Sequence, residues 1–252
     1  MKVYFIGAGP GDPELLTIKA RKIISRADII IYAGSLVNKD ILKLAGKEAV
    51  AYDSSKMTLE EVLGIMKKAK SGKKVIARVH TGDTSIYSSI QEQITWCDKE
   101  KIPHHVIPGV SSFCAGAASL KQELTLPGIS QTVIITRLSG RTKVPKKEEL
   151  KALSRIKATI VIFLSVDKIS EVARQLSYGY GSGTPVAVVS RASWPDEKII
   201  KGTLKDIAGK VKREKINRQA LIFAGDVLRK EGFKKSRLYD KCFAHSYRKV
   251  KR

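Results

Sequence analysis

Short apolar runs alternate with longer amphipathic segments along nearly the whole chain. The apolar runs have the length of buried strands, and we predict strands there. These strands are residues 3–8, 28–32, 74–80, 105–107, 132–137, 159–164, 185–190 and 219–225, with 197–201 as a further strand of a hairpin. Strands separated by segments of helical length favour mainly parallel sheets covered by helices. The pattern therefore predicts an α/β fold.

Residues that cap helices mark several of the predicted helix starts. Asp12 precedes Pro13, and proline is favoured at the first helical position because the N–H of that position has no helical partner. Thr58 and Glu61 have the spacing of a capping box, which predicts a helix to about residue 70. Asp167 caps a helix expected to reach about residue 178. Further helices are predicted at residues 85–100, 111–120, 146–154 and 203–211.

The alternation is interrupted once, at residues 121–130, which contain Pro127 and Gly128. A chain of 252 residues is long enough for two domains that each bury a core. We therefore expect an N-terminal α/β lobe at 1–120, a linker at 121–130 and a C-terminal α/β lobe at 131–252.

Small and polar residues follow many of the predicted strands. In open α/β sheets, ligands bind outside the carboxyl ends of the strands. The turns of this kind are residues 9–12, 81–85, 108–112, 164–167, 190–193 and 224–226. Residues 7–12 do not match a dinucleotide fingerprint, because Asp12 stands where the last glycine is required and would repel a phosphate. Each turn taken alone fits a helix cap as well as a ligand contact.

Charge and composition limit the partners without naming one. The net charge is +23, from 47 basic and 24 acidic residues, and such a field attracts nucleic acid, anionic lipid or a substrate with several carboxylates. A solvated surface rich in lysine explains the same charge. No apolar run approaches a membrane span and the N-terminus is not a signal peptide, so we expect a cytoplasmic protein. Three widely spaced cysteines favour a reducing compartment.

No enzyme-borne nucleophile or metal centre is evident in the sequence. The four histidines are not spaced as metal ligands, and His104 and His105 would point to opposite faces of a strand. No Ser-His-Asp or Cys-His arrangement is recognisable. These observations argue against hydrolase chemistry.

Several motifs together resemble those of the tetrapyrrole methyltransferases of cobalamin and sirohaem synthesis. The general family pattern comprises GAGPGDPELLT at 7–17, ADIIIY at 27–32, the Gly-Asp turn after strand 74–80, and PGVSS at 108–112. One branch of the family is matched over nearly the whole chain. Its motifs are YAGSLV at 32–37, RVHTGDTSIY at 78–87, ELTLPGISQTVIITRLSGRT at 123–142, ASWPDEKI at 192–199 and SRLYDKCFAHSYRK at 236–249.

The resemblance implies a two-lobed α/β enzyme, usually a homodimer, with S-adenosylmethionine in a cleft between the lobes. The family pattern implies cofactor contacts at Pro10, Thr81, Gly82, Asp83, Ile86, Ser111, Ser112, Leu164 and Ala192. Two positions depart from it. Thr84 replaces the usual proline after Gly-Asp, and Ala33 replaces an aspartate that uroporphyrinogen-modifying relatives carry in a proposed proton-acceptor role. No catalytic residue is therefore carried over.

The matching branch implies methylation of precorrin-4 or cobalt-precorrin-4 at C-11. This macrocycle carries many carboxylates, which gives the positive charge of the chain a purpose. The basic residues expected to bind it are Arg137, Arg141, Arg191 and Lys198. A related methyltransferase acting on another corrin carbon is one alternative. A basic RNA-binding protein is another, although aromatic residues are only 6% and no stacking motif is present.

Overall fold

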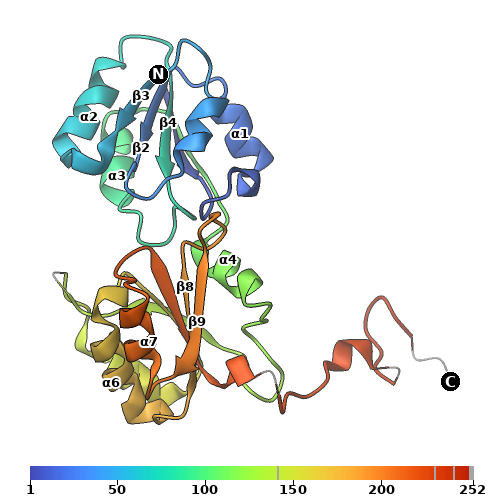
Figure 1. Cartoon of the computed structure of the whole chain (residues 1–252). Helices are drawn as coiled ribbons and strands as arrows, with labels where there is room; N and C mark the ends of the chain where they lie inside the picture. Colours follow the sequence, from blue (N-terminus) through green and yellow to red (C-terminus); the bar gives the residue numbers. More distant parts are fainter. Residues whose placement is uncertain (141, 230, 241, 250–252) are drawn as a thin grey trace. The chain divides into compact units, whose positions relative to one another are not determined.

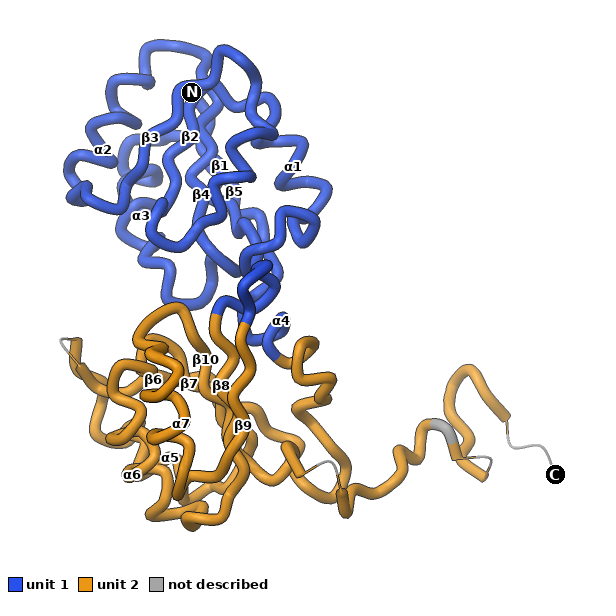
Figure 2. The backbone as a smooth tube through the Cα atoms, in the orientation of Figure 1, with its two compact units in different colours: residues 1–116, 191–197 blue, residues 117–190, 198–252 orange. Residues whose placement is uncertain are grey.

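The computed structural model describes residues 1–140, 142–229, 231–240 and 242–249. The chain forms two compact units (Figure 2). Residues 1–116 and 191–197 make up the first unit, and residues 117–190 and 198–252 make up the second. The division differs from the predicted lobes mainly in the segment 191–197, which the sequence pattern placed in the C-terminal lobe.

The first unit contains a five-stranded sheet in which every pair of neighbours is parallel. The strand order is β3-β2-β4-β1-β5. The strands are β1 (Lys2–Gly7), β2 (Ile29–Tyr32), β3 (Val50–Asp53), β4 (Val75–His80) and β5 (His104–Ile107). Gly7 at the end of β1 is paired in register with His80 at the end of β4. The carboxyl ends of the strands therefore lie at one edge of this sheet.

Helices cover both faces of the first sheet (Figure 1). Tyr4 and Ile6 pack with α1 (Ile18–Ile24) on one face. Val3 and Phe5 pack on the other face with α2 (Leu59–Lys68) and α3 (Gln91–Lys99). This alternation follows from the period of two residues in a strand. The predicted capping box of α2 is confirmed, since Thr58 N–H donates to Glu61 and Glu61 N–H donates to Thr58 Oγ1.

The second unit contains a mixed sheet with the order β6-β7-β10-β8-β9. Its strands are β6 (Val133–Arg137), β7 (Thr159–Phe163), β8 (Pro185–Ser190), β9 (Lys198–Thr203) and β10 (Ala220–Ala224). The α/β class and the β8–β9 hairpin are confirmed, but only the β6–β7 pair is parallel. The expectation of mainly parallel sheets is wrong for this unit. The hairpin reverses the chain direction, so β10 enters the sheet antiparallel to both β7 and β8.

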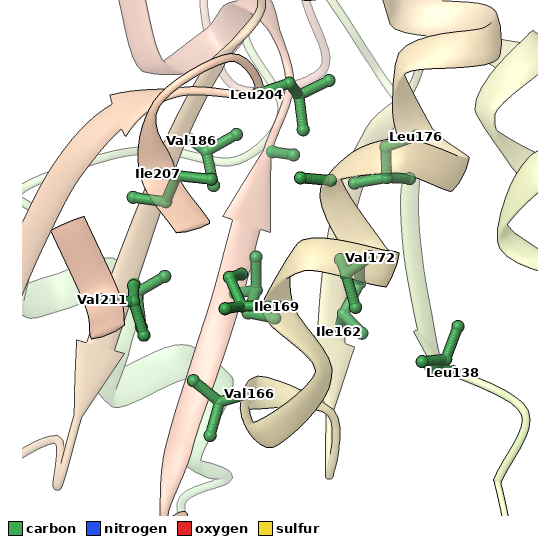
Figure 3. Close-up of a cluster of buried hydrophobic side chains, with 14 of the residues drawn as sticks. Leu138, Ile162, Val166, Ile169, Val172, Leu176, Val186, Leu204, Ile207 and Val211 are labelled. Carbon is green, nitrogen blue, oxygen red and sulfur yellow. The ribbon is translucent and has the colours of Figure 1, made fainter. Parts of the chain in front are cut away.

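The core of the second unit lies between its sheet and the helices α5 (Leu150–Leu153), α6 (Ile169–Tyr180) and α7 (Ile207–Arg213). Figure 3 shows how side chains of α6 and α7 meet those of the strands. In α6 the buried residues Ile169, Val172, Ala173 and Leu176 recur at helical spacing and form one apolar face. The helix α4 (Ser112–Ser119) spans the boundary between the two units.

Short 3-10 helices replace or interrupt some of the predicted elements. They are Pro13–Leu15, Lys39–Leu44, Ser54–Lys56, Lys146–Glu148, Ser154–Ile156, Val166–Lys168, Asp226–Arg229 and Arg237–Tyr239. The predicted helix 85–100 exists only as α3, because Tyr87 and Ser89 have positive φ angles that break a helix. The predicted helix 146–154 is divided into two 3-10 turns around α5. None of the helices in the described part of the chain is long and apolar enough to cross a lipid bilayer.

Candidate active site

Three turns at the carboxyl edge of the first sheet are joined through their backbones. They follow β1, β4 and β5. Gly9 and Gly82 form an isolated antiparallel bridge, in which Gly82 N–H donates to Gly9 O over 2.7 Å and Gly9 N–H donates to Gly82 O over 3.2 Å. Gly82 has a φ of +63°, a conformation that glycine adopts without strain. The turn after β4 therefore depends on a glycine at position 82.

The turn after β5 approaches the other two so closely that no side chain fits between them. A Cβ atom on Gly109 would lie 2.3 Å from the carbonyl oxygen of Gly82 and 2.6 Å from the carbonyl carbon of Gly7. A Cβ atom on Gly7 would lie 2.7 Å from the nitrogen of Gly109. Contacts of this kind are shorter than van der Waals packing allows. Glycines at these positions thus let the three turns form one closely packed backbone surface.

Asp83 fastens two of these turns with its carboxylate. Oδ2 accepts a hydrogen bond from Gly109 N–H over 2.8 Å. Oδ1 accepts one from Ser85 N–H over 2.8 Å and another from the Ser85 hydroxyl. Burial alone would raise the pKa of Asp83, but the hydrogen bonds from Ser85 and Gly109 outweigh it and lower the pKa from its ordinary value. Ser85, which the sequence suggested as a helix cap, instead binds Asp83, and α3 begins only at Gln91.

The segment 191–197, the loop of the β8–β9 hairpin, packs on the turn after β1. Trp194 Nε1 donates to the carbonyl oxygen of Pro10 over 2.9 Å. Ser193 Oγ accepts from Asp12 N–H over 3.0 Å. A Cβ on Gly11 would meet the Trp194 ring at 2.1 Å, so Gly11 provides the space for the indole. Ala192, which precedes Ser193 in the sequence, is buried.

The two predicted serines open α4. Ser111 is buried, and its carbonyl oxygen accepts from Cys114 N–H and Ala115 N–H. Ser112 is the first residue of the helix, and its backbone nitrogen lies 3.5 Å from the Cβ position of Gly82. Thr84 Oγ1 is buried and has no hydrogen-bond partner among the described residues. The start of α4 therefore lies against the turn after β4.

The predicted residues therefore fall into three groups. Pro10, Gly82, Asp83, Ser111, Ser112 and Ala192 belong to the joined turns and to the segment packed on them. Thr81 and Ile86 line a neighbouring pocket of about 410 Å³ at the ends of β2 and β4. Leu164 belongs to the second unit and stays a prediction.

Leu164 has an unusual conformation at the end of β7. Its φ is 52° and its side chain is 67% exposed. A left-handed conformation costs a non-glycine residue about 1–3 kcal/mol, and such strain concentrates at functional sites. The next residue, Ser165, holds the turn by accepting from Leu138 N–H and donating to the Phe163 carbonyl.

The basic residues predicted to bind substrate make contacts within the chain. Arg137 donates to the carbonyl oxygens of Leu138, Thr142 and Lys143. Arg191 pairs with Asp196 over 2.6 Å and stacks on Trp194. Lys198 pairs with Glu214 over 3.0 Å at the surface. Arg141 lies outside the described residues. Each of the three described cations would have to share or exchange its present partner to bind a carboxylate of a ligand.

Several residues of the site were missed by the sequence reasoning. Gly109, Ser193 and Trp194 lie in the motifs at 108–112 and 192–199, but their contacts join turns that are distant in sequence. Arg78 and His80 lie in the predicted strand 74–80, and they line the 410 Å³ pocket together with Thr81 and Ile86. One signal in the sequence could have identified Arg78 and His80 as site residues. They are an arginine and a histidine at alternate positions of a strand whose other residues are apolar.

Comparisons with known proteins show which family this chain belongs to. Residues 2–208 match the model of the Tetrapyrrole (Corrin/Porphyrin) Methylases. A cobalt-precorrin-4 C(11)-methyltransferase of Methanocaldococcus jannaschii is 55% identical over 98% of this chain and 96% of its own length.

Two solved structures are also similar to this chain. A cobalt-precorrin-4 methyltransferase superimposes with a TM-score of 0.88 at 42% identity, covering 90% of this chain and 95% of the other. A uroporphyrin-III C-methyltransferase of Thermus thermophilus, complexed with S-adenyl homocysteine, has a TM-score of 0.78 at 26% identity and covers 92% of this chain and all of its own. This chain therefore belongs to the tetrapyrrole (corrin/porphyrin) methylases and is a methyltransferase.

Proposed function

We propose that this enzyme transfers a methyl group from S-adenosylmethionine to C-11 of precorrin-4 or cobalt-precorrin-4 in cobalamin synthesis. The observation that carries the proposal is the full-length similarity to the Methanocaldococcus jannaschii enzyme, whose name states this reaction with the cobalt form. The branch motifs at 123–142 and 236–249 support the same substrate over another corrin carbon.

The joined turns of the first unit suit S-adenosylmethionine better than a nucleotide phosphate. Asp12 and Asp83 place carboxylates at two of the turns, which would repel a phosphate and favour a cationic ligand. The buried hydroxyl of Thr84 has no partner in the described part of the chain, and such a group indicates a missing ligand or water. The residues that would hold the cofactor in this unit are Pro10, Thr81, Gly82, Asp83, Ile86, Ser111, Ser112 and Ala192, and Leu164 is the one proposed from the second unit.

When bound, S-adenosylmethionine supplies a methyl group activated by its positively charged sulfur. The attacking atom belongs to the substrate, so this chain needs no nucleophile of its own, and its residues mainly orient the partners and exclude water. Alignment of this kind supplies roughly 7–11 kcal/mol in favourable cases. The close approach of Gly7, Gly82 and Gly109 provides a tightly packed backbone surface for that task. Asp83 acts as a positioning residue, because its oxygens hold Gly109 and Ser85.

The charge of the chain suits a tetrapyrrole with many carboxylates. A net charge of +23 attracts such an anion, and the rate of association falls as salt rises. Arg137, Arg141, Arg191 and Lys198 remain the basic residues proposed to contact it. A homodimer in the cytoplasm is also part of the proposal. Light scattering with a calibrated standard tests the first of these properties, and cell fractionation tests the second.

Two measurements test the function. Calorimetry with S-adenosylhomocysteine is expected to give saturable binding of one ligand per chain. Incubation with radiolabelled S-adenosylmethionine and the tetrapyrrole is expected to move the label into the macrocycle. Absence of binding and of transfer in a folded preparation would overturn the proposal. Tight binding of RNA by the same preparation at physiological salt would favour the alternative.

A further inference from the structure

A pocket of about 410 Å³ lies beside the joined turns of the first unit, and we call it the β2–β4 pocket. Its wall includes Ala33, Ser54, Arg78, His80, Thr81 and Ile86. These residues come from the carboxyl ends of β2 and β4 and from the turns that follow β3 and β4. Two of them, Arg78 and His80, are polar and buried, and they lie at alternate positions of β4.

Arg78 is a buried cation that is hydrogen-bonded to neutral groups. Its side chain is 7% exposed, and it donates to three neutral acceptors. These are Gln93 Oε1 at 3.0 Å, Ser54 Oγ at 3.1 Å and Ile31 O at 3.2 Å. Within the described ranges, no carboxylate lies within ion-pair distance of this guanidinium. Burial lowers the pKa of Arg78 to about 10, so the side chain remains charged near neutral pH. A buried charge paired only with neutral groups favours an anion from outside.

His80 lines the same pocket. It is 5% exposed, and its Nε2 atom is buried with no hydrogen-bond partner among the residues that the structure describes. Burial, followed by the positive charge of Arg78, lowers the pKa of His80 to about 3. The ring is therefore neutral, and one of its nitrogens is free to donate a hydrogen bond. A buried nitrogen of this kind destabilises the fold unless a ligand or water binds it.

A purely structural role explains only part of this arrangement. The three bonds of Arg78 tie β4 to β2, to the turn after β3 and to α3, which stabilises the unit. This role does not require a cation, and it leaves His80 Nε2 without a hydrogen-bond partner in the part of the chain that the structure describes. The carboxylate that lines the pocket, Glu92, is exposed and is not paired with Arg78. A ligand carboxylate would satisfy both Arg78 and His80.

We propose that the β2–β4 pocket receives one carboxylate side chain of the tetrapyrrole, with Arg78 as its cationic partner and His80 as its neutral hydrogen-bond donor. The identity of the ligand as a tetrapyrrole rests on the proposed function. Thr81 and Ile86, two of the proposed cofactor contacts, line the same pocket, so the anchored side chain would lie beside the cofactor. An anchor at this point would restrict which ring carbon faces the methyl donor.

The test compares two variants at position 80 and a control. His80→Leu removes the donor and also the unsatisfied nitrogen, so its free energy of unfolding is expected to equal or exceed that of the wild type. His80→Gln keeps an N–H donor. His105→Leu, on β5, is the control because His105 is an exposed strand histidine outside this pocket. The probe is uroporphyrin, a stable tetrapyrrole with carboxylate side chains, whose binding is followed by its absorbance without any methyl transfer.

We expect His80→Leu to weaken uroporphyrin binding about tenfold. His80→Gln and His105→Leu should change uroporphyrin binding little. All three variants should bind S-adenosylhomocysteine with the affinity of the wild type. With the true substrate, His80→Leu should raise KM more than it lowers kcat. Uroporphyrin binding by a folded His80→Leu variant that equals the wild type would overturn the proposal. Failure of the wild type to methylate C-11 would reject the proposed function while leaving this binding test intact.

A second measurement uses the unaltered chain, in case a variant does not fold. Labelling histidine with ¹⁵N makes the ring nitrogens visible by NMR. The signals of His80 are assigned by their disappearance in His80→Gln. If that variant does not fold, they are assigned as the ring signals that keep the chemical shift of neutral histidine at pH 6. Addition of uroporphyrin is expected to shift the His80 nitrogen signals in a saturable manner. Signals of His80 that do not move at saturating uroporphyrin would contradict the proposal.

Discussion

The Asp83 carboxylate accepts a hydrogen bond from the backbone N–H of Gly109 over 2.8 Å, although the two residues belong to turns after different strands. This bond fixes the turn after β4 against the turn after β5. The same carboxylate holds Ser85, so one side chain determines the shape of the surface on which the cofactor is proposed to bind.

Asp83→Ala should therefore weaken cofactor binding through the shape of these turns. Removal of the carboxylate leaves the partly buried Gly109 N–H without its acceptor, which costs about 1–3 kcal/mol of stability. We expect the affinity for S-adenosylhomocysteine to fall about tenfold or more. Urea unfolding and calorimetry on the same preparation measure the two effects.

Asp53→Ala is a matched control for this variant. Asp53 Oδ1 also accepts from two backbone N–H groups, those of Gly34 and Ser55, but it joins the turns after β2 and β3. The Asp53→Ala variant should lose about as much free energy of unfolding as Asp83→Ala, and it should keep the wild-type affinity for S-adenosylhomocysteine. Equal affinity in Asp83→Ala and the wild type would show that Asp83 has no part in the cofactor site.

Gly109→Ala should destabilise the first unit severely. The added Cβ would lie 2.3 Å from the Gly82 carbonyl oxygen, and both contacting groups are backbone that cannot rotate away. We expect a loss of about 3 kcal/mol or more, at the upper end of overpacking effects. Thermal or urea unfolding monitored by circular dichroism gives the value.

Gly64→Ala is the control, because it adds the same Cβ atom at a position with free space. Gly64 lies within α2, and a Cβ there meets no atom within 4 Å. The substitution should stabilise the chain by about 0.5–1 kcal/mol, because alanine is the better helix former. A Gly109→Ala protein as stable as Gly64→Ala would contradict the close approach of the three turns.

Much of the fold follows from local patterns in the sequence. The Thr58–Glu61 capping box and the apolar run of β4 depend on neighbouring residues, and both were predicted. β3 was missed because it is only four residues long and ends in the polar Asp53, so its apolar run is too short to stand out. The antiparallel entry of β10 depends on how distant segments pair, which no local pattern records.

The candidate site was less predictable because its contacts join distant segments. The family pattern pointed to Asp83 but not to Gly109 as its partner, 26 residues further along. The bond from Trp194 to Pro10 spans 184 residues. His80 resembled an ordinary strand residue, since its missing hydrogen-bond partner is evident only in three dimensions.

Trp194→Phe should loosen the turn after β1. The substitution keeps an aromatic ring but removes the hydrogen bond to the Pro10 carbonyl, which is worth about 0.5–1.5 kcal/mol. Hydrogen exchange should speed up at the Asp12 amide, which donates to Ser193 in the same segment. Trp96→Phe in α3 is the control and should leave exchange at Asp12 unchanged. Unaltered exchange in Trp194→Phe would show that the segment 191–197 does not hold this turn.

His80 should make the stability of the chain depend on pH. Its pKa is about 3 in the folded chain and near 6.5 when unfolded, so the unfolded chain binds an additional proton below pH 6.5. The free energy of unfolding contributed by neutral His80 is complete above that pH and falls by about 1.4 kcal/mol for each pH unit below it. Urea unfolding at pH 7.5, 6 and 5 measures this slope.

His80→Leu should remove that part of the slope. The comparison isolates His80 because carboxylates with lowered pKa values titrate below this range, and the other histidines are present in both proteins. Identical pH dependence in the variant and the wild type would mean that His80 is not buried in its neutral form.

The position of the transferred methyl group tests the central claim most directly. The enzyme is incubated with S-adenosylmethionine carrying a ¹³C-labelled methyl group, with cobalt-precorrin-4 in one reaction and precorrin-4 in another, and the label is located by NMR. The account predicts the labelled methyl on C-11 of the macrocycle. A labelled methyl on any other ring carbon would contradict it.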